Sequence, residues 1–136
     1  MLAFKVLLDT NMLMMIAEKR MDVFRQIETV LRGKVDFIAS KMVLEELTRI
    51  AKEKSQRGRR ARLALKLAEK SKIDLANPTA GESTDDHLTR LARETGGIVA
   101  TGDAELRERL RNANMPVIYV RKDSRIAVEG IEPAYR

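Results

Sequence analysis

The sequence predicts an α/β fold, a three-layer α/β/α sandwich with a mainly parallel central sheet. Two observations lead to this prediction. Short apolar runs alternate along the chain with longer stretches of helical periodicity, and such alternation is typical of parallel strands linked by helices. With 136 residues, the chain has the length of one ordinary domain. We therefore expect residues 1–136 to form a single domain of this class.

The first strand is expected at residues 4–8, FKVLL. A continuous apolar run of this kind suits a strand that is buried on both faces of a parallel sheet. Similar runs predict further strands at residues 35–40, 73–76, 98–101 and 117–120. The segment from Ser124 onward has the weakest pattern and is expected to be either a tail or an edge strand.

Helices are expected between these strands. Ser83 followed by Asp86 resembles a capping box, which predicts that a helix starts at about Thr84. The apolar residues MLMMI, at 12–16, are expected either in the core or at a dimer surface or partner groove. The helical stretches are residues 12–31, expected to form two helices, and residues 42–54, 59–71, 84–94 and 104–112.

Composition excludes several classes of protein. The chain has no cysteine, so neither disulfides nor a zinc–thiolate site can stabilise it. No apolar run approaches the roughly 20 residues of a membrane helix, and the amino-terminal run meets an acidic residue too early for a secretory signal. We therefore expect a soluble, cytoplasmic protein without a membrane partner.

The net charge of +6 is unevenly distributed, because basic residues are concentrated between residues 49 and 72. This segment could contact a phosphate backbone, or it could be the solvated face of a helix. The candidate RNA-binding residues are Arg49, Lys52, Arg57, Arg59 and Arg60.

Two acidic residues follow predicted strands. Asp9 ends the first strand and Asp103 lies just past the fourth. Because ligands of open parallel sheets bind at the carboxyl ends of the strands, both side chains should reach the same edge. Each could instead cap the helix that follows it. Asn11 and Thr101 add polar side chains at these turns.

Two further acidic residues lie on the apolar sides of predicted helices. Glu46 shares a face with Val43, Leu47 and Ile50, whereas Glu45 lies over Arg49. A carboxylate on an apolar face is costly without a partner, so Glu46 is the better candidate ligand.

The same comparison favours Asp85, which lies above Leu88 and Ala92, over Asp86, which precedes Arg90 by four residues. Asp86 remains an auxiliary candidate. Alternatively, its carboxylate only interacts with the positive amino-terminal end of the helix dipole. Asp85 could also be only a helix cap.

One shared cause explains all four positions. Carboxylates at close range repel one another, and hard cations such as Mg²⁺ or Mn²⁺ take oxygen ligands and remove this conflict. The sequence therefore predicts a metal-dependent nuclease site formed by Asp9, Glu46, Asp85 and Asp103. His87 is expected to be exposed on a helix. Because it is the single histidine of the chain, the histidine pair of a metal-independent ribonuclease is absent.

At these residues the chain resembles PIN-domain nucleases. The matching segments are LLDTNML at 7–13, IASKMVLEEL at 38–47, STDDHLTRLA at 83–92 and IVATGDAELRERLRNANMPVIYV at 98–120. The last segment and the Asp-Asp pair most resemble the branch that includes a nuclease of small-subunit ribosomal RNA processing, whereas the length resembles VapC toxins. The resemblance implies a Mg²⁺- or Mn²⁺-dependent endoribonuclease, often a homodimer, and for a toxin an antitoxin partner.

Two alternatives remain beside the nuclease. One is a non-catalytic RNA-binding or ribosome-assembly module that keeps the fold and the acidic residues. The other is a receiver-like phosphoacceptor, since Asp9 follows the first strand and Lys122 follows the last. The position of Glu46 on a helix disfavours this last alternative.

Overall fold

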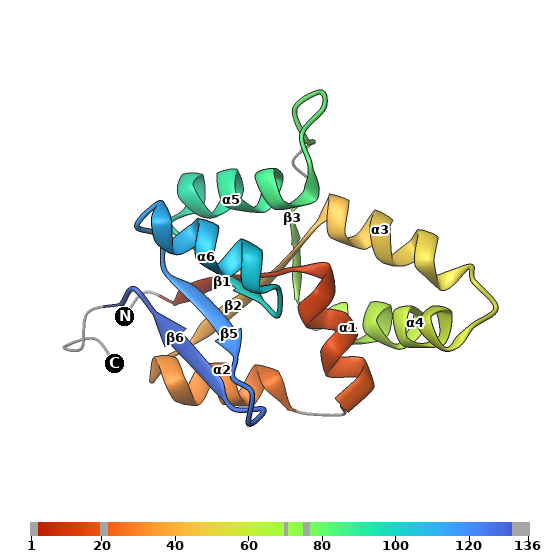
Figure 1. Cartoon of the computed structure of the whole chain (residues 1–136), viewed down its shortest axis with the longest axis horizontal. Helices are drawn as coiled ribbons and strands as arrows, with labels where there is room; N and C mark the ends of the chain where they lie inside the picture. The colour runs from red at the N-terminus through yellow and green to blue at the C-terminus, as the bar shows by residue number, and fades with distance from the viewer. Residues whose placement is uncertain (1–2, 20–21, 70, 75–76, 132–136) are drawn as a thin grey trace.

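A central sheet of six strands organises the computed structural model, which describes residues 3–19, 22–69, 71–74 and 77–131 (Figure 1). The strand order is β3-β2-β1-β4-β5-β6. The strands from β3 to β5 pair in parallel, and β6 runs antiparallel beside β5. The mainly parallel sheet predicted from the sequence is thus confirmed. Its strands are β1 (Phe4–Leu8), β2 (Val35–Ser40), β3 (Lys72–Asp74), β4 (Ile98–Thr101), β5 (Val117–Val120) and β6 (Ile126–Glu129).

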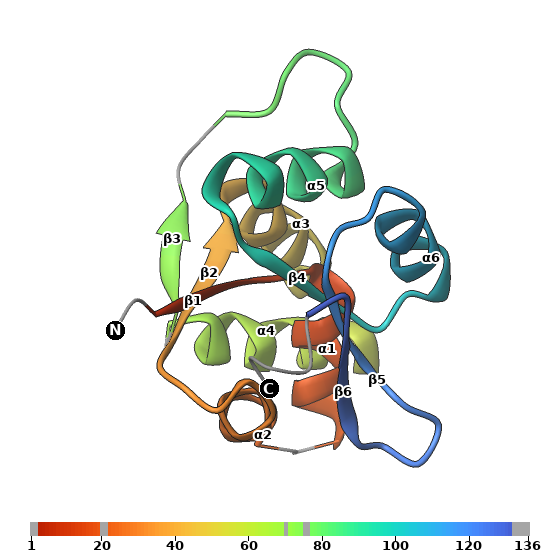
Figure 2. The same cartoon turned by 90° about the vertical axis from the view of Figure 1, so that its left-hand side faces the viewer.

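Helices cover both faces of this sheet. Helices α5 and α6 pack on β1, β4 and β5 from one side, while α1, α2 and α4 lie on the other (Figure 2). This arrangement confirms the three-layer α/β/α sandwich. The helices are α1 (Thr10–Lys19), α2 (Val23–Leu31), α3 (Lys41–Ala51), α4 (Gln56–Ala68), α5 (Thr84–Thr95) and α6 (Ala104–Asn112).

Several boundaries differ from the predicted ones. The strand expected at residues 73–76 begins at Lys72, and residues 75 and 76 lie outside the described residues. Helix α3 ends at Ala51 and α4 begins at Gln56, because the Ser55 hydroxyl accepts the N–H of Gly58 at 3.1 Å and so caps α4 earlier than the basic residues suggest.

The weakly patterned segment after Ser124 forms an edge strand. Ile126 and Val128 are buried, while Ala127 and Glu129 are half-buried, which is the alternation of a strand with one face on the core. The strand β6 therefore closes one side of the sheet and contacts α2.

The core surrounds β1, whose residues Val6, Leu7 and Leu8 are fully buried. In α1 the side chains of Met12 and Leu13 are also fully buried, and the neighbouring methionines 14 and 15 pack against the core. Met12, Leu13 and Ile16 thus belong to the core, while Met14 and Met15 are half-buried, and a dimer surface at these residues stays a prediction. Among the described residues, no helix combines the length and the apolar character that crossing a bilayer requires.

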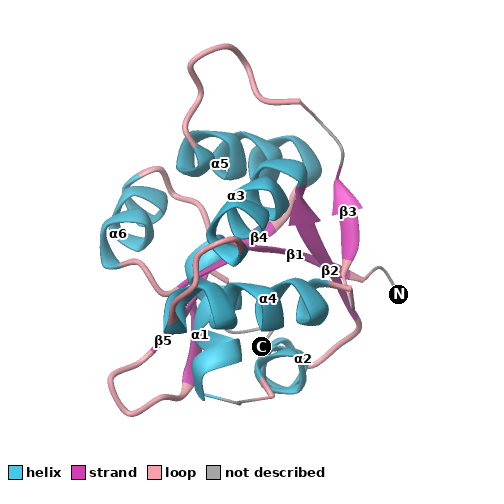
Figure 3. Cartoon of the chain, turned by 90° about the vertical axis from the view of Figure 1, so that its right-hand side faces the viewer, coloured by secondary structure: helices cyan, strands magenta, loops and turns pink. Residues whose placement is uncertain are grey.

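The topology decides where functional side chains gather. Parallel pairing directs the carboxyl ends of β2, β1, β4 and β5 to one edge of the sheet. The helices α1, α3 and α6 begin directly at this edge, each within three residues of the end of a strand. Helix α5 is preceded by residues 77–83, a loop that extends away from the sheet (Figure 3).

Candidate active site

The ends of β1 and β4 bring Asp9, Thr101 and Asp103 together. Asp9 is only 4% exposed, and Thr101 is fully buried. The Thr101 hydroxyl donates to Asp9 Oδ2 and accepts the backbone N–H of Asp103 at 2.9 Å. One buried hydroxyl therefore orients the Asp9 carboxylate and fixes the turn that carries Asp103.

Both aspartates also cap helices. Asp9 Oδ1 accepts the N–H of Met12 at 2.6 Å, at the start of α1. Asp103 Oδ1 accepts the N–H of Glu105 at 2.8 Å, at the start of α6. The capping role and the shared edge, which the sequence leaves as alternatives, thus occur together. For Asp103, the hydrogen bonds of the described residues involve Oδ1 alone, so Oδ2 is available to a ligand.

Asn11 reaches the same turn from α1. Its side chain lies so close to Gly102 that a Cβ atom at that glycine would be 2.5 Å from Asn11 Oδ1. Asn11 itself is exposed. The glycine is therefore what allows the amide of Asn11 to approach the backbone beside Asp103.

Helix α3 contributes Glu46 from a half-buried position, whereas Glu45 is exposed. The Thr84 hydroxyl, in the first turn of α5, donates to Glu46 Oε2 at 3.1 Å. Because Asp85 directly follows Thr84, this bond brings Glu46 to the start of α5. The difference in burial between the two glutamates is the one that helical periodicity predicts.

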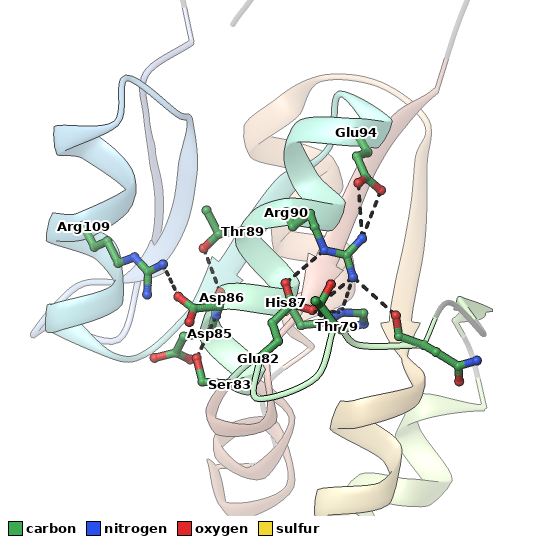
Figure 4. Close-up of polar contacts among 11 residues, drawn as sticks. Thr79, Glu82, Ser83, Asp85, Asp86, His87, Thr89, Arg90, Glu94 and Arg109 are labelled. Carbon is green, nitrogen blue, oxygen red and sulfur yellow. Dashed lines mark hydrogen bonds and ion pairs between the residues drawn. The ribbon is translucent and has the colours of Figure 1, made fainter.

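Helix α5 begins with two aspartates that have different environments. Asp85 is half-buried, and the charges of Asp103 and Glu46 act on it. Asp86 bonds instead to the guanidinium of Arg109, on α6 (Figure 4), which lowers the pKa of Asp86. Arg109 is thus a basic side chain that lies beside the two aspartates at the start of α5.

The pKa of Asp9 shows the electrostatic cost of the cluster. Burial, opposed by the hydrogen bonds from Thr101 and Met12 and assisted by the charges of Asp85 and Asp103, raises this pKa from 3.8 to about 7. Burial and then the charge of Asp103 also raise the pKa of Asp85. The charges of Asp85 and Asp103 thus act on Asp9, and those of Asp103 and Glu46 act on Asp85, so these carboxylates repel one another.

This group fits a hard divalent cation in its chemistry. The donors are carboxylate oxygens, which Mg²⁺ and Mn²⁺ prefer, and a cation would relieve the repulsion. In the described part of the chain, no three acidic or histidine side chains lie close enough together to hold a metal ion. The ligand roles of Asp9, Glu46, Asp85 and Asp103 therefore stay predictions.

His87 differs from its prediction, because it is fully buried instead of exposed. Its Nδ1 atom lies 3.1 Å from Glu82 Oε1 and 3.0 Å from Arg90 Nη2 (Figure 4). Hydrogen bonds from Arg90 and from the Thr79 N–H lower the pKa of Glu82 to about 2. This cluster fastens the loop before α5 onto the helix that carries Asp85. The sequence gives no signal for it, since the loop residues follow no periodic pattern.

The basic segment lies on the far part of α3 and on α4. Arg57 pairs with Glu53 at 2.8 Å, and Arg60 lies 3.6 Å from Glu18 of α1. The remaining candidates, Arg49, Lys52 and Arg59, are exposed, and the last two line an open pocket of about 430 Å³. RNA binding by this segment stays a prediction.

Comparison with protein families gives a match over most of the chain. The model of a family described as "PIN like domain" matches residues 6–123. The chain is 29% identical over 129 residues to Ribonuclease VapC4 of Methanocaldococcus jannaschii, with 94% of this chain and 98% of the relative covered. It is 33% identical over 127 residues to Ribonuclease VapC9 of Archaeoglobus fulgidus, covering 91% and 88% of the two chains.

Similarity also extends to a eukaryotic protein and to a solved structure. The rRNA-processing protein FCF1 of Saccharomyces cerevisiae is 33% identical over 110 residues, which are 79% of this chain and 54% of FCF1. The structure of the PIN domain endonuclease Utp24 superposes with a TM-score of 0.76 and 27% identity, covering 93% of this chain and 92% of that one. The chain therefore belongs to the PIN-domain ribonuclease family.

Proposed function

We propose that this chain is a divalent-metal-dependent endoribonuclease that hydrolyses phosphodiester bonds of RNA. The observation that carries the proposal is the coupled group of carboxylates at the carboxyl edge of the sheet, in which burial and neighbouring charges raise the pKa of Asp9 to about 7. Such a group lowers its own energy by holding a cation. The names of the relatives as ribonucleases agree with this chemistry.

The proposed ligands of the cation are Asp9, Glu46, Asp85 and Asp103. A bound Mg²⁺ or Mn²⁺ ion would supply neutralisation of the phosphate charge and activation of water for in-line attack. With water as the nucleophile and the 3′-oxygen as the proposed leaving group, which takes up a proton, the products should carry 5′-phosphate and 3′-hydroxyl ends.

The chain's own residues hold the ligands in place. The Thr101 hydroxyl orients Asp9, and the Thr84 hydroxyl orients Glu46. The Asp86 carboxylate holds Arg109 beside the group, where we propose that its guanidinium faces the negative charge of the substrate.

The experiment is cleavage of labelled single-stranded RNA in Mg²⁺, Mn²⁺ or EDTA by the wild type and by Asp103→Asn. Asparagine caps a helix as well as aspartate does, so the variant should keep α6 while losing the charge. Asp22→Asn makes the same change at the exposed cap of α2 and should leave activity unchanged. Metal-dependent cleavage that survives in Asp103→Asn would overturn the proposed ligand role.

A role in ribosomal RNA maturation is a second candidate beside that of a VapC-type toxin with an antitoxin partner. The similarity to the rRNA-processing protein FCF1 favours maturation, whereas the nearly full-length similarity to VapC4 favours the toxin. Sequencing the RNA ends produced by the wild type and by Asp103→Asn in cells separates the two. A maturation enzyme should produce ends at the boundaries of precursor rRNA. A toxin should produce ends elsewhere, and its expression should also arrest growth.

A further inference from the structure

A pocket of about 480 Å³ lies at the carboxyl end of β5, the strand next to β4 in the sheet. Arg107, Tyr119, Arg121, Lys122 and Asp123 line this β5 pocket. Tyr119 is paired with Thr101 across the parallel strands β5 and β4, which places the two residues roughly 5 Å apart. The Arg107 N–H donates to the Asp103 carbonyl at 3.0 Å, so Arg107 lies one helical turn beyond a predicted metal ligand.

The wall of the β5 pocket contains a stacked pair. The guanidinium carbon of Arg107 lies 3.5 Å from the centre of the Tyr119 ring. Glu129, on β6, bonds to the Arg107 guanidinium and holds it in this position. The pair thus joins α6 to β5 and is held by β6, and an aromatic ring with a guanidinium beside it suits the stacking of a nucleobase.

The mouth of the β5 pocket is positively charged. Within the described residues, Asp123 is paired with Arg125 at 3.2 Å and Glu129 with Arg107, which neutralises both acids near the pocket. Arg121 and Lys122 are exposed and form no ion pair with another described residue. A backbone bond of 2.7 Å from the Arg121 N–H to the Arg125 carbonyl closes the turn that presents them.

We propose that the β5 pocket is a nucleotide-binding subsite that holds a nucleotide of the single-stranded RNA next to the cleaved bond. Arg121 and Lys122 bind the backbone phosphate, and the Arg107–Tyr119 pair stacks on the base. The volume of the β5 pocket lies within the range of roughly 300–1,000 Å³ that is usual for ligand sites. This inference rests on the proposed ribonuclease function, since Tyr119 of the pocket is paired with Thr101, whose hydroxyl bonds to the proposed ligand Asp9.

The test is binding of a short fluorescent single-stranded RNA in EDTA, followed by anisotropy. We compare the wild type with Arg121→Ala/Lys122→Ala and with Lys5→Ala/Lys34→Ala. The last pair removes the same charge from exposed positions at the amino ends of β1 and β2. The first pair should weaken binding about ten-fold and lower the slope of log affinity against log salt by about 1.4. Equal losses in both pairs, or no loss in the first, would overturn the phosphate contact.

The stacking contact has its own control. The wild type should bind the RNA about five-fold more tightly than an abasic strand of the same length. Tyr119→Phe should keep this preference and Tyr119→Leu should lose it, with folding checked by circular dichroism. Identical preferences in the two variants would refute stacking on Tyr119.

Cleavage separates this inference from the proposed function. In Mg²⁺ the Arg121→Ala/Lys122→Ala variant should have a raised KM and an unchanged kcat, because it keeps the four carboxylates. An unchanged KM would overturn the subsite. Absence of cleavage by the wild type would contradict the proposed function, while the anisotropy measurements in EDTA would still judge the subsite.

Discussion

Removing the charge of Asp9 should stabilise the metal-free protein at neutral pH. The pKa of this carboxyl is raised from 3.8 to about 7 in the folded state, so between these values the folded chain binds a proton that the unfolded chain has released. Stability must then fall as the pH rises from about 4 to about 7. At about 1.4 kcal/mol per pH unit, ionised Asp9 lowers the free energy of unfolding by about 4 kcal/mol.

The variant Asp9→Asn lacks this ionisation and should lose that part of the pH dependence. At pH values above 7 it should be more stable than the wild type by up to about 4 kcal/mol, reduced by about 1 kcal/mol because an amide cannot accept both hydrogen bonds of the carboxylate.

Urea unfolding in EDTA, followed by circular dichroism across this pH range, measures the difference. Asp22→Asn is the control, since it makes the same change at an exposed helix cap. The reasoning is refuted if Asp9→Asn and the wild type lose stability equally as the pH rises.

Three further predictions concern the site and its supports. Mg²⁺ should raise the unfolding temperature more at a pH above 7 than at acidic pH, because protons compete for the carboxylates; an equal rise in Asp9→Asn would exclude this residue as a ligand. Thr101→Val should reduce kcat about 10- to 100-fold, as loss of an orienting partner does at metal sites, whereas Thr101→Ser should retain activity. Gly58→Ala should lower the free energy of unfolding in urea by about 1–3 kcal/mol, because its Cβ would lie 2.0 Å from the Glu53 carbonyl oxygen; unchanged stability would show that the turn between α3 and α4 adjusts freely.

Local periodicity accounts for what the sequence could predict. The apolar run of β1 is fully buried at Val6, Leu7 and Leu8, because both faces of a parallel strand are covered. The helical repeat separated half-buried Glu46 from exposed Glu45. These assignments depend only on neighbours along the chain, so a single sequence suffices for them.

The features that the sequence could not predict depend on contacts between residues that are far apart along the chain. His87 is buried because Glu82 and Arg90 fasten a loop over α5, which no periodic pattern encodes. The β5 pocket likewise needs the register that sets Tyr119 beside Thr101 and the return of β6 with Glu129. Lys122 alone, read along the chain, gave no indication of this pocket.

The measurement that tests the central claim most directly is cleavage of single-stranded RNA in Mg²⁺ by Glu46→Gln and Glu45→Gln. The two variants make the same change at adjacent residues of α3, one half-buried beside the carboxylates and one exposed. We predict that Glu46→Gln loses metal-dependent cleavage and that Glu45→Gln cleaves like the wild type. Equal activity of the two variants would contradict a metal site that includes Glu46.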